Sequence, residues 1–569
     1  MSAEVTEVTG AARAVETADV VIAGGGPNGL MLACELGLAG IRALVLERQP
    51  EPSTEARANG LVGQVVRTVD HRGLYERLSG EPGPPRPHSA AFMFGAMTLD
   101  LSVLESSPVY TLPVPQVRIV AVLAERAVEL GAEIRRGHEV TGLAQALGDG
   151  GDGGDCGTDG GTDEGGVTVD VAAGTGPYRI RARYLVGAEG AHSVTRKRSG
   201  IGFPGVSYDR RTTRIAHATV PRDWIDPETR GLRVPGRDEP IPAFLPLRTE
   251  RGALAFAPFS LESPMLSTTE WAAPDTEQPM TLGELAASIS RVLGAEVPLG
   301  PPTGEGPHAL RRLVGGHTRV AERFRDRRVF LIGDAAHVYT AGGGPGLNLG
   351  LQDAVNLGWK LAAALHGRAP DGLLDSYDTE RRAAARRMVT YSQAQSALQA
   401  PGSDVTALRE LFGELLADRD TVQRLADLTA GTDVRYAMGE DGADTHPLVG
   451  RLAPELELRT AEGEFRLAEL ARTGRALLLD LTEDASPAGA LSVRGGEEPG
   501  FARVDIHTAR PRRPGARLPA TALLLRPDGY VAWASSAPSP APAELDALRA
   551  AARRWLGFPA SARPASAQA

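Results

Sequence analysis

Glycine-rich turns that follow apolar runs are the first residues of this chain that could build a chemical site. The segment GGGPNG follows the apolar run DVVIA, and Gly24, Gly26 and Gly29 occupy the positions of a G-x-G-x-x-G turn. Such glycines permit a tight turn, the approach of a pyrophosphate and close packing of a helix on its strand. Pro27 and Asn28 complete the turn where a helical pattern begins. We therefore expect phosphate groups at the N-terminus of this helix.

The elements around this turn support a dinucleotide site. Apolar residues at 19–23 predict a buried strand, residues 27–39 a helix and residues 42–46 the next strand, which together form a βαβ unit. Glu47 ends the second strand, where an acid can accept hydrogen bonds from a ribose diol. This pattern alone does not choose between NAD and FAD.

Two further turns follow apolar runs much later in the chain. GAEGAHSVTRK contains Glu189, and RVFLIGDAAH contains Asp334. Taken alone, each acid is more typical of a turn or a helix cap. Together with the first turn, they predict convergence on one ligand with an adenosine end, a pyrophosphate and a polyhydroxylated chain. FAD is such a ligand, and its ribityl hydroxyls would reach Asp334.

Composition and charge exclude several classes of protein. A chain of 569 residues with 42% hydrophobic residues predicts two to four soluble globular domains. No apolar run approaches the length of a membrane span, and the N-terminus lacks the pattern of a signal peptide. The net charge of −10 gives no support for nucleic-acid binding. Cys34 and Cys156 are too few for a disulfide framework or a four-cysteine zinc site, so we expect a cytoplasmic protein without a metal.

Several motifs, in a fixed order, give the chain a family resemblance. They are GGGPNGL, ARANGLVGQVVRTVDHRGL, GAEGAHSVTRK, FLIGDAAH, GLNLGLQDAVNLGWKLAA, SYDTERR and LLRPDGYVAW. Over about residues 18–560, the chain resembles the group A FAD-dependent aromatic hydroxylases of the p-hydroxybenzoate hydroxylase type. Within that group it is similar to bacterial aromatic-polyketide hydroxylases that carry an added C-terminal thioredoxin-like domain.

The resemblance implies an α/β fold with a doubly wound, Rossmann-like FAD-binding domain and an inserted β-rich substrate domain. The expected ranges are a disordered tail at 1–17, the FAD-binding domain at 18–190 and 310–400, the substrate domain at 191–309 with segments near 70–115, a helical connection at 401–446 and the thioredoxin-like domain at 447–560. The glycine-rich, acidic stretch at 148–166 is expected to be a flexible loop. The C-terminal domain lacks a Cys-x-x-Cys pair, so it cannot perform dithiol redox chemistry.

The resemblance also assigns residues to non-covalently bound FAD. The turn Gly24, Gly26, Pro27, Asn28 and Gly29 would hold the pyrophosphate, Glu47 the adenosine ribose, Arg48 the adenine end, Arg57 a loop that reaches the FAD, Gln116 the phosphate–ribityl region, Asp334 the ribityl chain, and Pro345, Gly346, Leu347 and Asn348 the side of the isoalloxazine ring. Glu189 stands where the family has an aspartate tied to both FAD and NAD(P)H. A proline common in the loop before Pro345 is absent, so that loop is the least predictable part of the site.

The reaction implied by the resemblance is aromatic hydroxylation. NADPH or NADH would reduce FAD, O₂ would add to give a flavin C4a-hydroperoxide, and the distal oxygen would pass to a phenolic ring of an aromatic polyketide. The catalytic candidates are Tyr339, His217 and Tyr208, whereas His337 is expected to be structural. The run TERRAAARRMV is expected to form a solvated or salt-bridged helix face.

Three alternatives stay open at this point. They are a Baeyer–Villiger oxygenase on the same scaffold, a flavin oxidase or dehydrogenase without oxygen insertion, and a non-enzymatic flavin-binding protein. We expect a monomer or a homodimer, with no nucleic-acid or membrane partner.

Overall fold

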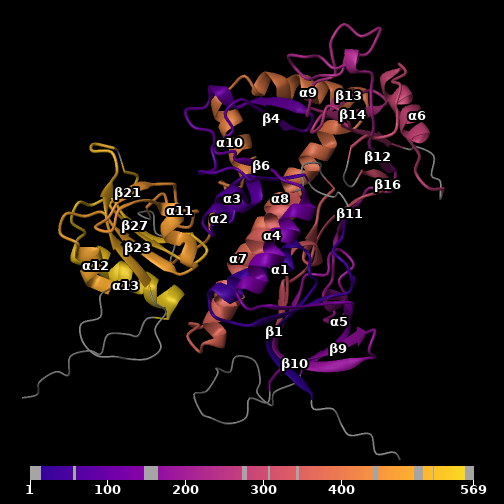
Figure 1. The fold of residues 1–569 in the computed structure, drawn as a ribbon. Helices are drawn as coiled ribbons and strands as arrows, with labels where there is room; N and C mark the ends of the chain where they lie inside the picture. The colour runs from indigo at the N-terminus through magenta and orange to yellow at the C-terminus, as the bar shows by residue number, and fades with distance from the viewer. Residues whose placement is uncertain are drawn as a thin grey trace, which may run out of the picture.

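Figure 1 shows three regions in this computed structural model of the chain. They are an N-terminal α/β domain, a middle domain at the upper right and a C-terminal domain at the left. The structure describes residues 15–54, 59–145, 165–271, 278–304, 308–340, 345–439, 446–491, 504–516 and 518–557. Among these residues, no helix combines the length and apolar character needed to cross a membrane.

The N-terminal domain is built on an eight-stranded sheet with the order β18-β19-β10-β1-β2-β7, to which β9 and β8 attach. The strands are β1 (Glu16–Ala23), β2 (Ala43–Glu47), β7 (Glu133–Arg136), β8 (His138–Gln145), β9 (Val167–Ala173), β10 (Tyr178–Gly187), β18 (Arg325–Asp326) and β19 (Val329–Leu331). Strands β7, β2, β1, β10 and β19 run parallel, and the others are antiparallel. Continuous burial of residues 20–23 is typical of a parallel strand covered on both faces.

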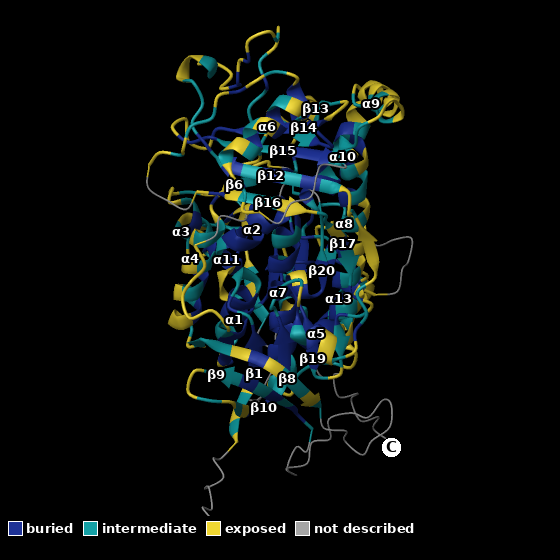
Figure 2. Cartoon of the chain, turned by 90° about the vertical axis from the view of Figure 1, so that its right-hand side faces the viewer, coloured by how far each residue is buried: buried dark blue, intermediate teal, exposed yellow. Residues whose placement is uncertain are grey.

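Helices cover one face of this sheet. They are α1 (Pro27–Leu38), α2 (Gln64–Asp70), α3 (Tyr75–Ser79), α4 (Gln116–Glu129), α7 (Pro345–Leu365) and α8 (Leu373–Gln399), and their apolar residues share one core. On the other face, the core lies beneath the antiparallel β8 and β9, and the short helix α5 (Val194–Arg198) contacts β8 and β10. The predicted α/β class is confirmed, with antiparallel strands and a short helix in place of a second layer of long helices. Figure 2 shows how deeply α7 is buried at the centre of the molecule.

The middle domain is an antiparallel sheet with the order β13-β14-β15-β12-β16 and one covering helix. Its elements are β12 (Arg211–His217), β13 (Leu247–Thr249), β14 (Gly252–Ala257), β15 (Met265–Trp271), β16 (Leu310–Val314), α6 (Leu282–Leu293) and the short turn η2 (Arg222–Trp224). Because β16 pairs with β12, residues 310–314 extend this sheet beyond the predicted boundary at 309. A small sheet of β11 (Gly205–Ser207), β17 (His317–Val320) and β20 (His337–Val338) joins the middle domain to the N-terminal one.

The segment near 70–115 forms small sheets separate from the middle sheet, so its predicted share in the substrate domain stays a prediction. Its elements are β4 (Ala91–Phe94), β5 (Met97–Asp100), η1 (Leu101–Val103) and β6 (Thr111–Pro113), and β6 pairs with β3 (Gly60–Val62). The β4–β5 hairpin and η1 pack instead on α8 and α10 (Arg419–Ala430). The helix α9 (Ser403–Leu415) precedes α10 and is largely exposed (Figure 2).

The C-terminal domain contains a four-stranded sheet with the order β24-β23-β26-β27. Its elements are β21 (Glu457–Arg459), β22 (Glu464–Arg466), α11 (Leu467–Leu470), η4 (Ala471–Thr473), β23 (Ala476–Asp480), α12 (Ser486–Leu491), β24 (Val504–Thr508), β25 (Arg510–Pro511), β26 (Ala522–Leu525), β27 (Val531–Ser535) and α13 (Pro542–Leu556). Strands β23 and β24 are parallel, and the β26–β27 hairpin is antiparallel to β23. This arrangement is compatible with a thioredoxin-like fold, which stays a prediction.

Candidate functional site

Three glycine-containing turns leave the central sheet side by side. Strands β1, β10 and β19 are adjacent and parallel, so their carboxyl ends meet at one edge. Hydrogen bonds continue this alignment into the turns, from Ala188 N to Ala23 O (2.7 Å) and from Ile332 N to Gly187 O (3.0 Å). The segments that begin at Gly24, Ala188 and Ile332 therefore converge at one place, although more than 300 residues separate the first from the last.

The glycines of the first turn have different surroundings. Gly24 has φ +110°, and a Cβ on it would lie 2.5 Å from the carbonyl oxygen of Ala188. A Cβ on Gly29 would lie 2.1 Å from the carbonyl oxygen of Gly24, whereas a Cβ on Gly26 would meet no atom within 4 Å. The outer glycines are thus required by packing, and the central one faces open space. No side chain caps α1 at Gly26, so its N-terminal N–H groups can receive an anion there.

Glu47 lies against the same turn. Its carboxylate accepts hydrogen bonds from Gly25 N (2.7 Å) and Gln49 N (2.9 Å). Arg48 is exposed beside it, and Gln116 is half-buried as the first residue of α4. Arg57 lies outside the described residues.

Asn28 connects the first turn to the far half of the site. A Cβ on Gly333 would lie 1.9 Å from Asn28 Nδ2, and a Cβ on Gly350 would lie 2.5 Å from it. Gly333 has φ +58°, which favours glycine. The Oδ1 atom of Asn28 is buried without a hydrogen-bond partner. This role could not be read from the sequence, because the two glycines follow Asn28 by about 300 residues.

Asp334 faces the first turn of α7. Its side chain is exposed, and a Cβ on Gly346 would lie 3.3 Å from its Oδ1 atom. Pro345 is buried, Leu347 is half-buried, and Asn348 Oδ1 accepts a hydrogen bond from Val62 N at 3.2 Å. The positive end of a 21-residue helix therefore lies beside the carboxylate of Asp334.

Glu189 forms hydrogen bonds within the turn that contains it. Its carboxylate accepts hydrogen bonds from Ser193 Oγ (2.7 Å), Thr195 N (2.9 Å) and the Thr195 hydroxyl. These contacts are those of a cap for α5, the alternative role of an acid in such a turn. The structure thus gives Glu189 a positioning role in its turn, and its contact with the cofactor stays a prediction.

The predicted catalytic candidates lie on separate elements. Tyr339 donates a hydrogen bond to Ala385 O (3.0 Å), and burial raises the pKa of Tyr339 well above its usual value, so it does not suit a base. His217 Nδ1 accepts a hydrogen bond from Ala309 N (2.8 Å), and burial lowers the pKa of His217. Tyr208 is half-buried between β11 and β12. Among the described residues, no hydrogen bond or ring contact joins these three.

His337 has the structural role that the sequence predicted. It is fully buried, and its Nε2 atom lies 2.7 Å from Asp353 Oδ2. In the part of the chain that the structure describes, no group of three histidine, cysteine or acidic residues could hold a metal ion.

A cavity with a volume of about 60 Å³ adjoins the first turns of α7. Its apolar side chains come from β4, α7, α8 and α10, and the main ones are Phe92, Met93, Leu349, Met388 and Leu428. The ion pair of Arg387 and Asp433 (2.7 Å) also lines it. Strands of the middle domain contribute no described residue to its lining, so the cavity belongs to the N-terminal domain and the helices that follow it.

The polar side chains of the cavity that sequence reasoning missed include Tyr391, Gln395 and Thr429. Gln395 Nε2 and Thr429 Oγ1 are buried, and neither forms a hydrogen bond of normal geometry. Burial raises the pKa of Tyr391, and the nearby side chains of Thr429 and Gln395 partly oppose that rise. The signal available in the sequence was a polar residue, Gln395, on the apolar face of a predicted helix. The sequence does not show which segments pack against that face, so it could not predict the cavity. Buried donors and acceptors in an apolar cavity can bind the polar groups of a ligand.

Comparison with known proteins identifies related sequences over nearly the whole chain. The FAD-binding-domain family matches residues 17–392, and the family of C-terminal domains of aromatic-ring hydroxylases matches residues 446–559. The chain is 39% identical over 550 residues to 12-dehydrotetracycline 5-monooxygenase/anhydrotetracycline 6-monooxygenase of Streptomyces rimosus, covering 95% of this chain and 99% of that protein. It is 37% identical over 526 residues to a rifampicin monooxygenase of Streptomyces venezuelae, covering 91% and 95%. The solved structure of anhydrotetracycline hydroxylase from Streptomyces rimosus is similar, with a TM-score of 0.77 and 38% identity over 96% of this chain and 100% of that one.

Proposed function

The chain belongs to the family of FAD-dependent aromatic-ring hydroxylases, and we propose that it hydroxylates a phenolic, multi-ring aromatic polyketide with NAD(P)H and O₂ as co-substrates. FAD is its cofactor. The observation that carries the proposal is the convergence of the Gly24 turn, the Asp334 turn and the start of α7 at one edge of the sheet. An extended FAD would be held there from both of its ends.

The residues at this edge fit FAD. Open space at Gly26 and the uncapped end of α1 suit the pyrophosphate, and Glu47 suits the adenosine ribose. Asp334 would accept hydrogen bonds from the ribityl hydroxyls. The first turn of α7, with Gly346, would lie beside the isoalloxazine ring. Three further residues are proposed to complete the contacts with FAD. Arg48 would lie at the adenine end, Arg57 would belong to a loop that reaches the FAD, and Gln116 would contact the phosphate–ribityl region.

The bound cofactor, once reduced by NAD(P)H, supplies the activated oxygen. The protein binds and orients the cofactor and the substrate, and it excludes water from the site. The N-terminus of α7 favours negative charge beside it, through its dipole and its N–H groups. The contacts of Tyr339 and His217 leave neither placed as a base, so we propose that an ionised phenol of the substrate provides its own activation.

We propose that the cavity beside α7 receives part of the substrate. Its apolar side chains suit fused aromatic rings, while Tyr391, Gln395 and Thr429 suit hydroxyl and carbonyl groups. A carbonyl that accepts a hydrogen bond from Gln395 Nε2 would satisfy a donor that is otherwise buried without one.

The test uses anhydrotetracycline, which the name of the Streptomyces rimosus relative identifies as a substrate of that protein, and ¹⁸O₂. We expect a yellow protein with bound FAD, faster NADPH consumption in the presence of the tetracyclic phenol, and one ¹⁸O atom in a new hydroxyl. Product NMR that shows a lactone would instead support the Baeyer–Villiger alternative. An oxidised product without ¹⁸O would show an oxidase or dehydrogenase. A protein that binds no FAD would contradict the proposal.

A further inference from the structure

We propose that the β26–β27 hairpin of the C-terminal domain is a positioning element of the flavin site. Through Tyr436, Arg381 and Asp353, this hairpin would fix the Gly333–Asp334 turn and the start of α7. The inference rests on the proposed binding of FAD at that turn, and it assigns a role to a domain whose lack of a Cys-x-x-Cys pair leaves it without redox chemistry of its own.

Arg526 carries the hairpin into the N-terminal domain. Its side chain is fully buried, and its guanidinium binds Glu380 of α8 through two hydrogen bonds, of 2.6 Å to Oε1 and 2.9 Å to Oε2. It also pairs with Asp528 of its own hairpin. A planar guanidinium bound in this two-point manner fixes direction as well as distance.

The charges around Arg526 balance. Lys360 of α7 donates to Glu380 Oε2 (2.8 Å), so two cations face the two anions Glu380 and Asp528. Asn356 of α7 bridges the same two acids, with Nδ2 at 2.8 Å from Glu380 and 3.1 Å from Asp528. Both flavin-side helices, α7 and α8, are therefore bound to one hairpin by buried polar contacts.

Arg381, the next residue of α8, faces the flavin side. It is fully buried, and Asp353 neutralises it at 2.7 Å, in agreement with the salt-bridged alternative predicted for this arginine-rich face. Its Nη2 atom donates to Leu349 O of α7 (3.0 Å). Asp353 in turn accepts hydrogen bonds from Gly333 N (3.0 Å) and His337 (2.7 Å). Arg381 thus holds both the helix and the turn between which the flavin end of FAD would lie.

Tyr436 closes the connection between the hairpin and Arg381. Arg381 Nη1 donates to the Tyr436 hydroxyl at 2.7 Å. The Tyr436 ring stacks on Tyr530 of the hairpin, with centroids 4.2 Å apart and planes at 25°. The guanidinium of Arg526 lies 5.4 Å from the Tyr436 centroid and 4.5 Å from that of Trp555.

A second contact ties the hairpin to the phosphate-side helix. Arg72 donates to Pro527 O (2.8 Å) and pairs with Glu35 of α1 (2.6 Å), and both side chains are buried. The hairpin therefore contacts α7 and α8 directly and is connected to α1 through Arg72.

The test is the variant Tyr436→Phe, which keeps the ring stack and removes the acceptor of Arg381. We expect the Kd for FAD to rise about threefold to tenfold, since part of a charge-assisted hydrogen bond that orders the site is lost. The flavin absorbance maximum should shift as well. Tyr178→Phe is the matched control, because it removes a hydroxyl bonded to His138 (2.7 Å) away from this network, and it should leave both values unchanged.

Arg526→Lys provides a second measurement, since it keeps the charge and loses the two-point geometry. We expect a folded protein with FAD affinity at least about threefold weaker. If wild-type protein binds FAD and both variants bind it equally well, the inference is wrong while the proposed function stands. If wild-type protein binds no FAD, the proposed function itself is wrong.

Discussion

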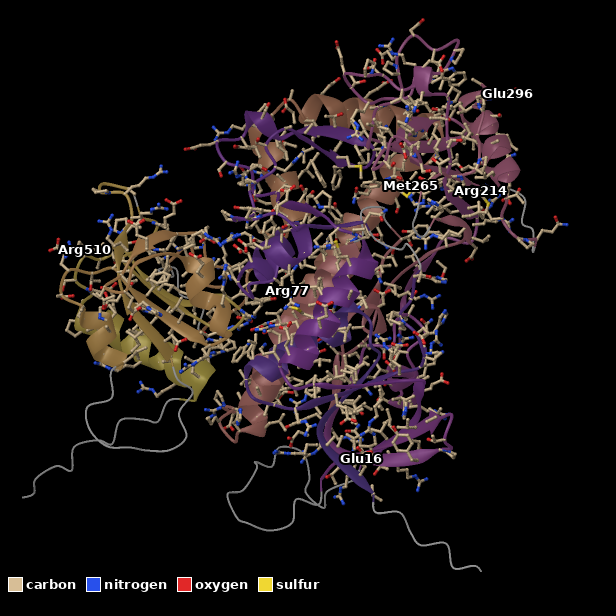
Figure 3. The ribbon with its side chains drawn as sticks, viewed as in Figure 1. Glu16, Arg77, Arg214, Met265, Glu296 and Arg510 are labelled. Atoms are coloured by element: carbon tan, nitrogen blue, oxygen red, sulfur yellow. The ribbon has the colours of Figure 1, made fainter. Side chains whose placement is uncertain are left out.

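The middle domain and the C-terminal domain are bound to the flavin domain in different ways. Figure 3 labels Arg214 in the middle domain and Arg510 in the C-terminal domain, on opposite sides of the molecule. The buried ion pairs of Arg214 stay inside the middle domain, to Glu270 (2.8 Å) and to Glu284 (2.7 Å). Arg248 of β13 bonds across the boundary, but to the backbone oxygen of Ala400 (2.8 Å) at the end of α8, away from the flavin turns. In contrast, Arg526, a fully buried charge of the C-terminal domain, pairs across the boundary with Glu380.

This difference suggests a division of labour. The ion pairs of Arg214 lie inside the middle domain, so substitutions there can alter that domain without disturbing the flavin turns. Arg526 of the C-terminal domain is buried against Glu380 of α8, so changes in that domain should also change the positions of the flavin-side helices. We therefore expect substitutions at the two boundaries to affect FAD binding very differently.

Glu380→Gln should have the largest effect. It leaves Arg526 and Lys360 buried with only Asp528 to balance them, which should cost about 3–5 kcal/mol in the free energy of unfolding. The Kd for FAD should rise as well. Urea denaturation and FAD titration would measure the two effects, and a loss below 1 kcal/mol (about the net value of one hydrogen bond) would contradict the account.

Glu284→Gln is the matched change in the middle domain. Because Glu284 is partly exposed and binds Arg214 and Arg312, we expect about 1–2 kcal/mol of destabilisation. The Kd for FAD should not change, since these contacts stay inside the middle domain. Weaker FAD binding in this variant would break the comparison between the two boundaries.

Gly26→Ala should weaken FAD binding at least about tenfold, or 1.4 kcal/mol, because the added methyl group occupies the space left for the pyrophosphate. Thermal unfolding of the apoprotein should stay within a few degrees of wild type, since no atom lies within 4 Å of that Cβ position. Gly174→Ala is the control, because its Cβ position is equally free. Equal FAD affinity in the two variants would argue against a phosphate site at this turn.

The two regions should also respond to pH, in two separate windows. Arg312 and Arg214 hold the pKa of Glu284 at about 2, against the effect of its partial burial, so its stabilising contribution is complete above pH 4.5 and is lost as the pH falls toward 2. Burial lowers the pKa of Lys360 to about 8 although Glu380 raises it, so the folded state loses this proton before the unfolded state does. Stability should therefore rise with pH between about 8 and 10.5 in wild type relative to Lys360→Met. Chemical denaturation at a series of pH values would measure both effects. If this assignment were wrong, the free energy of unfolding would vary with pH in parallel for wild type and Glu284→Gln in the acidic window, and for wild type and Lys360→Met in the alkaline window.

Tyr339→Phe should have the smallest effect. Its hydroxyl is bonded to Ala385 O, so we expect a loss of about 1 kcal/mol in stability and a change in kcat within about threefold. A fall of a hundredfold or more in kcat would restore Tyr339 as a catalytic residue.

Local pattern was enough to predict the cofactor turns but not their surroundings. The strand, turn, helix and acid from residue 19 to Glu47 follow one another in sequence, so periodicity and spacing reveal them. Asn28 against Gly333 and Arg526 against Glu380 depend on packing between distant segments, which no local pattern encodes. Arg381 shows the limit most clearly, because a run of arginines has the same composition whether water or Asp353 neutralises it.

The central claim is that two distant turns hold the two halves of one FAD. Calorimetric titration of wild type and Asp334→Ala with FAD and with ADP, which carries only the adenosine and pyrophosphate, tests it most directly. We predict one FAD per chain, FAD binding at least about tenfold weaker (1.4 kcal/mol) in Asp334→Ala, and equal ADP binding in both proteins. Equal FAD affinity in the two proteins, or an equal loss of ADP and FAD binding, would contradict the account.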